Sequence, residues 1–249
     1  MTPDAASRRY SIDALGRLWE ELKAIGRRDA GDQQLHVAIK TANESKSALV
    51  SMVQIPRRQT VLPGAIALAA FAAPRMLHLV AESLILSGFG VPRSKLPKSR
   101  IIVCGSTQYD AGVHGLIEAA GGAVVGDYHS GGELSVGSTI KLFEPAPRRP
   151  SETPLMELVA DRHRADLAAS RRCINAGAHI AQFASECGAN AAIFSYFPEE
   201  EALTWDYPEQ KAALEAAGVR VLRLPEQTRP FDVASNRAVV EAFVRGVGK

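Results

Sequence analysis

The chain has 249 residues, of which 46% are hydrophobic and 22% charged, a composition typical of a globular protein with a buried core. Its 29 basic and 27 acidic residues nearly balance, so the sequence does not indicate a nucleic-acid-binding protein with a strongly basic surface. No apolar run is long enough to span a membrane, and the first twelve residues contain no apolar segment typical of a signal peptide, so we expect a cytoplasmic protein.

The first hundred residues follow a helical pattern. Leucine and isoleucine recur at helical spacing over residues 15–25, and a second apolar stripe covers residues 35–53. A third helix is expected to begin after Gly64 and to be broken by Pro74. We therefore expect residues 1–98 to form a helical segment that packs on the domain that follows.

From Ser99 onward, short apolar runs alternate with helical patterns, which predicts an α/β domain over residues 99–249. Fully apolar runs of this length are typical of strands buried on both faces of a parallel sheet. The predicted strands are residues 101–104, 123–125, 191–194 and 219–224, and the predicted helices are residues 111–120, 164–187, 208–217 and 235–247. The expected fold is a doubly wound, mainly four-stranded parallel sheet, Rossmann- or flavodoxin-like, preceded by the helical segment.

Polar residues that directly follow the predicted strands are the candidates for a ligand site. In a doubly wound sheet, ligands bind at the carboxyl ends of the strands. His129 and Glu200 are the candidate catalytic residues. The candidate substrate-binding residues are Ser106, Thr107, Gln108, Tyr128, Ser130, Gly131, Ser195, Tyr196 and Glu226.

The three cysteines, Cys104, Cys173 and Cys187, have no CxxC spacing, which is typical of a reduced chain without a cysteine metal motif. Cys104 lies in a predicted apolar strand. Cys173 and Cys187 are expected on one helix, about 21 Å apart. We therefore expect structural roles for all three.

Several segments, taken in order, resemble one family. They are IKTANESKSALVSMVQIPRR, LPGAIALAAFAAP, RIIVCGSTQYD, LIEAAGGAVVGDYHSGG, the stretch from ANAAIFSYFPEEE to LRLPEQ, and NRAVVEAFVRG. Together they resemble the carboxyl-terminal half of a subunit of the 2-hydroxyacyl-CoA dehydratase and benzoyl-CoA reductase family. The resemblance implies an acyl-CoA substrate, and it implies lyase or oxidoreductase chemistry.

The resemblance also implies a four-iron four-sulfur cluster held by cysteines, and an ATP-dependent activator that delivers electrons. In this sequence, His129 and Glu200 stand where cluster cysteines would be expected. Imidazole and carboxylate are poor substitutes for thiolates in such clusters. We therefore expect that this chain alone holds no cluster, and that it works beside a homologous cluster-bearing subunit or as a homodimer.

Two functions remain open from the sequence. The first is an acyl-CoA-binding subunit of a dehydratase- or reductase-like complex. The alternative is a non-redox accessory module that binds a small ligand, or a metal through His129 and Glu200. At the level of single residues, His129 could be solvated or hydrogen-bonded in its loop, Glu200 could favour a helix start, and Ser106 and Thr107 could cap a helix near Asp110.

Overall fold

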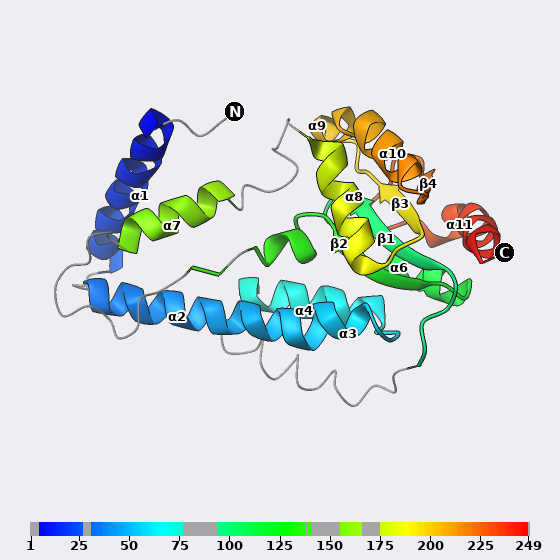
Figure 1. Ribbon diagram of the computed structural model, residues 1–249, viewed down its shortest axis with the longest axis horizontal. Helices are drawn as coiled ribbons and strands as arrows, with labels where there is room; N and C mark the ends of the chain where they lie inside the picture. The colour runs from blue at the N-terminus through cyan, green and yellow to red at the C-terminus, as the bar shows by residue number, and fades with distance from the viewer. Residues whose placement is uncertain are drawn as a thin grey trace. The chain divides into compact units, whose positions relative to one another are not determined.

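A computed structural model of the protein describes residues 5–26, 31–76, 94–137, 139–140, 155–165 and 175–248 (Figure 1). The chain divides into two compact units. One is drawn from Met1–Ser47 and Gly137–Leu167, and the other from Ala48–Val136 and Ala168–Lys249. The expected division between residues 1–98 and 99–249 stays a prediction.

The first unit is helical. It contains α1 (Ala5–Gly26), most of α2 (Asp32–Leu49) and α7 (Leu155–Ala165). Arg8 joins α1 to α7, because its guanidinium donates hydrogen bonds of 2.8 Å to the carboxylates of both Glu157 and Asp161. The helices predicted over residues 15–25 and 35–53 are thus present.

In the second unit, α2 continues through a short π-helix, η1 (Val50–Gln54), into α3 (Ile55–Arg57). The helix α4 (Gly64–Met76) begins where it was predicted. The predicted break at Pro74 is wrong, because α4 continues past it to Met76. A proline ring removes one backbone hydrogen bond, and here this loss does not end the helix. Within the described parts of the chain, no helix is both long and apolar enough to cross a membrane.

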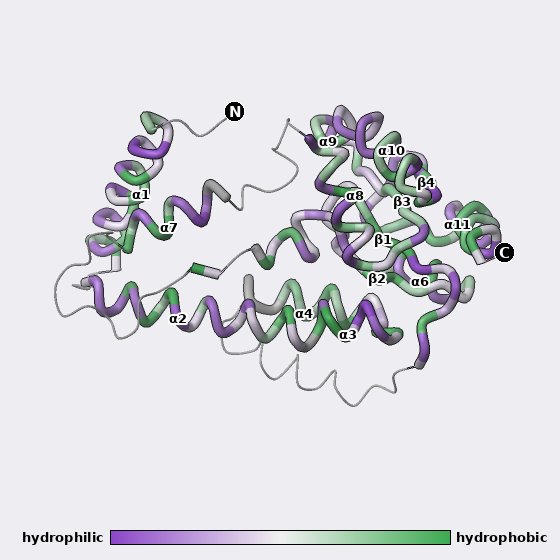
Figure 2. Tube along the Cα trace, in the orientation of Figure 1, coloured by the Kyte–Doolittle hydropathy of each residue, from purple (hydrophilic) through white to green (hydrophobic). Residues whose placement is uncertain are grey.

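The core of the second unit is a four-stranded sheet, β1 (Arg100–Gly105), β2 (Ala123–Tyr128), β3 (Ala191–Ser195) and β4 (Arg220–Arg223), in the order β2-β1-β3-β4. All three strand pairs are parallel. Every residue of β2 and β3 is buried, which agrees with the apolar runs in the sequence. Figure 2 shows hydrophobic residues along β1 and its neighbours.

Helices cover both faces of this sheet (Figure 1). On one face, α8 (Ala176–Cys187) and α10 (Tyr207–Ala216) pack on Ile102, Cys104 and Phe194, among others. On the other face, α6 (Gly112–Ala119) and α11 (Val233–Val247) pack on the alternate residues of the same strands. Alternation of side chains along a strand assigns neighbouring residues to opposite faces. The predicted doubly wound fold is therefore confirmed.

The single long helix predicted over residues 164–187 is wrong. Helix α7 ends at Ala165 and α8 begins at Ala176. Asn175, just before α8, has a φ of 64°, a left-handed conformation that a continuous helix does not allow. Asparagine adopts this conformation more readily than most residues, which is a local signal that helical periodicity alone does not reveal. Cys173 lies outside the described residues.

Candidate functional site

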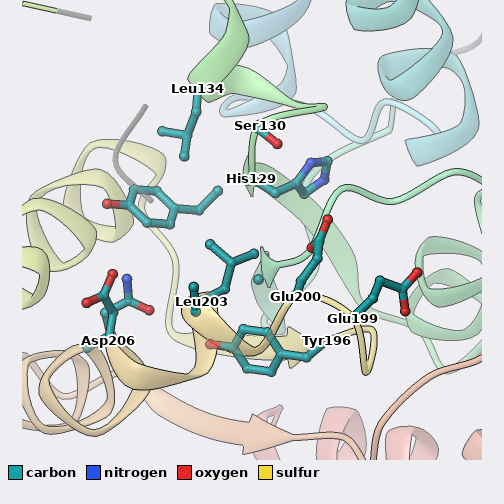
Figure 3. A pocket seen from close by; sticks show the side chains of 12 residues that line it. His129, Ser130, Leu134, Tyr196, Glu199, Glu200, Leu203 and Asp206 are labelled. Atoms are coloured by element: carbon teal, nitrogen blue, oxygen red, sulfur yellow. The ribbon is translucent and has the colours of Figure 1, made fainter. Parts of the chain in front are cut away.

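The strand order places a candidate site at the carboxyl ends of β1 and β3. From β1 the chain passes to β2 on one side, whereas β3 lies on the other side of β1. At such a reversal the connections leave the sheet in opposite directions and open a crevice. A pocket of about 260 Å³ lies at this edge (Figure 3). Its wall includes Gly105 at the end of β1, Tyr128 to Ser130 at the end of β2, and Tyr196 just after β3.

Gly105 forms part of the pocket wall and occupies a position that a residue with a side chain would not fit. Its φ is 104°, a conformation that residues with a side chain rarely adopt. A Cβ atom built there would lie 2.4 Å from the carbonyl oxygen of Ser195. The close approach of β1 to β3 at the pocket therefore requires glycine.

Substitution Gly105→Ala is expected to lower the free energy of unfolding by about 3 kcal/mol, because it combines backbone strain with an overlap against a backbone atom. The matched control is Gly121→Ala. Gly121 also has a positive φ, of 86°, but an added Cβ would meet nothing within 4 Å. That control should cost about 1 kcal/mol. Urea denaturation measures both, and equal costs would show that the overlap at Ser195 is relieved.

Ser106, Gln108 and Ser195 are buried and bonded to the protein itself. Ser106 Oγ accepts a hydrogen bond of 3.0 Å from the backbone N–H of Phe197, and Ser106 N–H donates to Ser195 O at 2.9 Å. The amide of Gln108 donates to Ser106 O at 2.8 Å. These three candidate substrate-binding residues thus tie the loop after β1 to the loop after β3.

The expected cap of the helix near Asp110 is wrong. The residue before α6 is Ala111, which has no side-chain acceptor, and Ser106 and Thr107 bond to other loops. Asp110 instead accepts a hydrogen bond of 2.8 Å from the backbone N–H of Gly112. Thr107 Oγ1 lies 2.6 Å from Ser130 Oγ and so joins the loop after β1 to the loop after β2. Among the other candidates, Gly131 is half-buried and Glu226 is exposed, and neither lines the described pocket.

Three buried polar groups in the pocket wall lack hydrogen-bond partners within the described residues. His129 is 1% exposed, and neither of its ring nitrogens is hydrogen-bonded; its Nε2 lies 3.6 Å from Asp127 Oδ1. The hydroxyl of Tyr196 and Oε2 of Glu200 are likewise buried without a partner. Figure 3 shows the side chain of Glu200 directed toward the ring of His129. Because buried polar groups normally have partners, this grouping indicates a site for a polar ligand.

A solvated His129 does not agree with its burial. Glu200 lies directly before helix α9 (Glu201–Trp205), where an acidic residue suits the helix start, although its side chain makes no capping hydrogen bond. Both candidate catalytic side chains also line the pocket.

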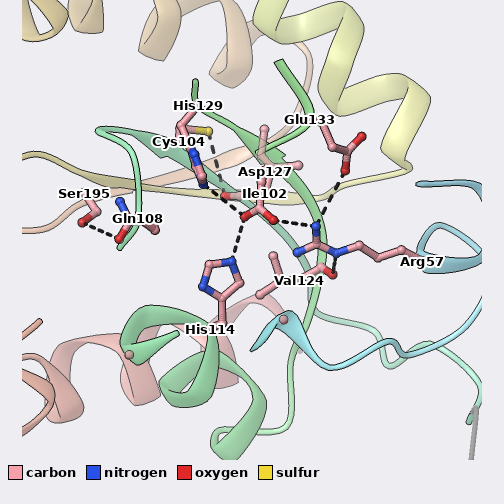
Figure 4. Close-up of polar contacts among 12 residues, drawn as sticks. Arg57, Ile102, Cys104, Gln108, His114, Val124, Asp127, His129, Glu133 and Ser195 are labelled. Carbon is pink, nitrogen blue, oxygen red and sulfur yellow. Dashed lines mark hydrogen bonds and ion pairs between the residues drawn. The ribbon is translucent and has the colours of Figure 1, made fainter. Parts of the chain in front are cut away.

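A buried ionic network lies behind His129 (Figure 4). Arg57 and Asp127 are both fully buried, and Arg57 Nη1 donates to Asp127 Oδ2 at 2.6 Å. Arg57 Nε donates to the carbonyl oxygen of Val124 at 2.8 Å. His114 Nε2 lies 2.8 Å from Asp127 Oδ1. Asp127 is therefore held from two sides, next to the pocket histidine.

Glu133, in the 3₁₀ turn η3 (Glu133–Ser135), extends this network. Its Oε1 lies 3.7 Å from Arg57 Nη1, and its Oε2 accepts a hydrogen bond of 3.2 Å from Arg58. Burial raises the pKa of Glu133 to about 7, although the two arginines act in the opposite direction. Burial alone would also raise the pKa of Asp127, but Arg57 and His114 outweigh it and hold that pKa well below its usual range.

The sequence analysis did not identify Arg57, His114, Asp127 and Glu133 as site residues. A signal was present for two of them. Asp127 is an acidic residue within an otherwise apolar strand, and His114 lies among apolar residues of a helix. Charged or polar residues in such positions are buried only with partners. The partner of Asp127 lies 70 residues away in the sequence, so pattern alone could not pair it with Arg57.

The described residues do not fit a four-iron cluster. Cys104 and Cys187 are both buried, and burial raises the pKa of each thiol, that of Cys187 to about 12. A four-iron cluster is held by four cysteine thiolates, and the described residues offer only these two cysteines, both enclosed in the apolar core. No group of three or more His, Cys, Asp or Glu side chains suited to a metal ion occurs in the parts of the chain that the structure describes.

Comparison with known proteins agrees with the sequence resemblance. No curated protein matches the chain. A family model described as 2-hydroxyglutaryl-CoA dehydratase, D-component, matches residues 1–245. The match covers nearly all of the sequence and includes every element of the sheet and its pocket. The chain therefore belongs to the 2-hydroxyglutaryl-CoA dehydratase D-component family.

Proposed function

We propose that this chain is an acyl-CoA-binding subunit of a 2-hydroxyacyl-CoA dehydratase-like complex. The observation that carries the proposal is the pocket at the carboxyl ends of β1 and β3, where His129, Tyr196 and Glu200 present buried polar atoms without hydrogen-bond partners among the described residues. Family membership supplies the class of substrate, and the pocket supplies a place for its polar groups.

The side chains suit the polar groups of a 2-hydroxyacyl thioester. An N–H of His129 can donate a hydrogen bond to the thioester carbonyl oxygen, and the Tyr196 hydroxyl is a second donor. A carboxylate accepts hydrogen bonds, so Glu200 can receive one from the 2-hydroxyl group. With the carbonyl and hydroxyl groups bound, the pocket would orient the carbon–oxygen bond that a dehydratase breaks. His129 and Glu200 are the proposed catalytic residues on this basis.

We propose further that any iron–sulfur cluster of the complex is carried by another subunit. The support is the donor set, since both described cysteines are protonated thiols in the apolar core. A homologous cluster-bearing subunit would then be the partner of an ATP-dependent activator. The alternative to this heteromeric complex is a homodimer of the chain.

A second candidate is a non-redox accessory module that binds a small ligand in the same pocket. The buried cysteines agree with this candidate as well, because a non-redox module needs no cluster ligands. A metal-binding version has less support, because no third ligand joins His129 and Glu200 among the described residues. The two candidate functions differ in whether the chain needs a cluster-bearing partner subunit.

Binding of a 2-hydroxyacyl-CoA ester is expected to stabilise the chain. With 2-hydroxyhexanoyl-CoA at about 100 times its Kd, the free energy of unfolding should rise by about 2.7 kcal/mol. Loss of one hydrogen-bonding side chain, in His129→Ala or Glu200→Gln, should weaken binding by about tenfold and reduce the gain to about 1.4 kcal/mol. Denaturation with and without the ester measures both.

The matched control is Glu201→Gln, next in the chain to Glu200, exposed and outside the pocket wall. It should leave the stabilisation unchanged. Equal stabilisation of all variants would show that the ester binds elsewhere, and no stabilisation of the unmodified chain would contradict acyl-CoA binding. Anaerobic purification with a candidate partner, followed by iron and sulfide analysis of the separated subunits, tests where the cluster lies. Iron that stays with this chain would contradict the second part of the proposal.

A further inference from the structure

Acidic side chains dominate the charge of the pocket wall. Glu199, Glu200 and Asp206 line the pocket, and no lysine or arginine is among the described residues that do. Burial, together with the nearby Glu209, raises the pKa of Asp206, as expected where negative charges gather. The pocket also contains two buried polar side chains without hydrogen-bond partners, His129 at 1% and Tyr196 at 2% exposure. The acidic residues therefore line the same pocket in which His129 and Tyr196 would bind a polar ligand.

Two arginines contact the pocket wall, and both already have partners there. Arg229 Nη2 lies 2.7 Å from Glu199 Oε1, and its guanidinium lies 4.4 Å from the centre of the Phe197 ring. Arg223 lies 5.4 Å from the centre of the Tyr196 ring, with its charge against the face of that ring. A ligand carboxylate that paired with Arg229 would lie beside Glu199, so two carboxylates would share one guanidinium.

The size and apolar surface of the pocket suit an acyl group. Its volume of about 260 Å³ is below the range of about 300–1,000 Å³ usual for drug-sized ligands. Leu134 and Leu203 lie on its wall together with the ring of Tyr196 (Figure 3). The space therefore fits the acyl end of a CoA ester and leaves the nucleotide outside.

We infer that this pocket selects an uncharged acyl group, so that the substrates are 2-hydroxyacyl-CoA esters without a second carboxylate. The inference rests on the proposed function and adds the class of acyl group. A terminal carboxylate, as in the 2-hydroxyglutaryl group, would enter beside Glu200 and Asp206, and no lysine or arginine lies on the described wall to pair with it. Like charges brought together in a partly enclosed site weaken binding by about a hundredfold or more. An uncharged chain would instead pack on the two leucines.

The test compares two esters of the same shape. One is 2-hydroxyglutaryl-CoA, and the other is 4-carbamoyl-2-hydroxybutanoyl-CoA, in which a neutral amide replaces the terminal carboxylate. Isothermal titration calorimetry of the full chain gives both Kd values. We expect the amide to bind about a hundredfold more tightly. Because the CoA part and chain length are identical, the ratio of the two Kd values reports only the terminal charge.

Two variants and a control connect that ratio to named residues. Asp206→Asn removes one acidic side chain, and Glu199→Gln leaves Arg229 free of its carboxylate partner beside the pocket. Each should reduce the ratio to about tenfold or less. Glu201→Gln removes the same charge from an exposed neighbouring position and should leave the ratio unchanged.

The outcomes distinguish this inference from the function beneath it. If both esters bind with similar Kd values, or the carboxylate binds more tightly, the selectivity inference is overturned and acyl-CoA binding stands. A ratio that persists in Asp206→Asn and Glu199→Gln also overturns it, because the wall would then not be its cause. If neither ester binds, the proposed function fails and the inference fails with it.

Discussion

Replacement of Arg57 by methionine is expected to lower the free energy of unfolding by about 3–5 kcal/mol. Arg57 is fully buried, and its guanidinium bonds both the carboxylate of Asp127 and the carbonyl oxygen of Val124. Methionine fills a similar volume but carries no charge. The variant therefore leaves Asp127 as a buried carboxylate without its main partner, which is far more costly than the loss of a surface ion pair.

The control for this variant is Arg58→Met, since Arg58 is partly exposed and its pairing with Glu133 is longer, at 3.2 Å. It should cost about 1 kcal/mol. The double variant Arg57→Met with Asp127→Asn removes both charges and should recover most of the lost stability. Urea denaturation at neutral pH measures all four proteins. A double variant no more stable than Arg57→Met alone would show that the cost comes from packing and not from the unpaired carboxylate.

Replacement of Glu133 by glutamine is expected to stabilise the protein increasingly as the pH rises. The folded-state pKa of Glu133 is about 7, above its ordinary value of 4.5. Between these two values the unfolded chain has lost its proton while the folded chain retains it, so stability falls with rising pH. The shift corresponds to about 3 kcal/mol, which the wild type loses as the pH rises from about 4.5 through 7 and the glutamine variant does not.

The measurement is the free energy of unfolding of both proteins at several pH values from 4.5 to 8. The two should be nearly equal at the acidic end and differ by up to about 3 kcal/mol at pH 8. The lowered pKa of Asp127 acts in a separate window, since its contribution is lost only as the pH falls below its ordinary value of 3.8. A difference between wild type and variant that stays constant with pH would contradict the raised pKa of Glu133.

The pattern of the sequence was sufficient for the architecture of the sheet. Apolar runs in β1, β2 and β3 predicted strands buried on both faces, and each lies where it was expected. The sequence pattern predicted helix boundaries less well where a single residue sets the backbone conformation. The left-handed backbone of Asn175 comes just before α8, where periodicity indicated a continuous helix, and α4 continues through Pro74, where the proline indicated a break.

The sequence indicated part of the pocket wall. Positions after strands placed Tyr128, His129 and Tyr196 at the edge where the pocket lies, because the carboxyl ends of parallel strands meet at one edge. The same reasoning also selected Ser106 and Gln108, whose side chains turn inward and bond to the protein. A position after a strand determines the edge on which a residue lies but not the direction of its side chain.

The sequence by itself determined the family, the order of strands and helices, and the edge of the sheet where a ligand could bind, since these depend on local periodicity and motif order. The tertiary structure decided which polar groups at that edge lack partners and which are buried as ions. Arg57 and Asp127 are 70 residues apart, and only folding brings their charges together. Burial then raises the pKa of Glu133, and the fold gathers Glu199, Glu200 and Asp206 on one pocket wall. Those contacts depend on distances in space, which no pattern along the chain contains.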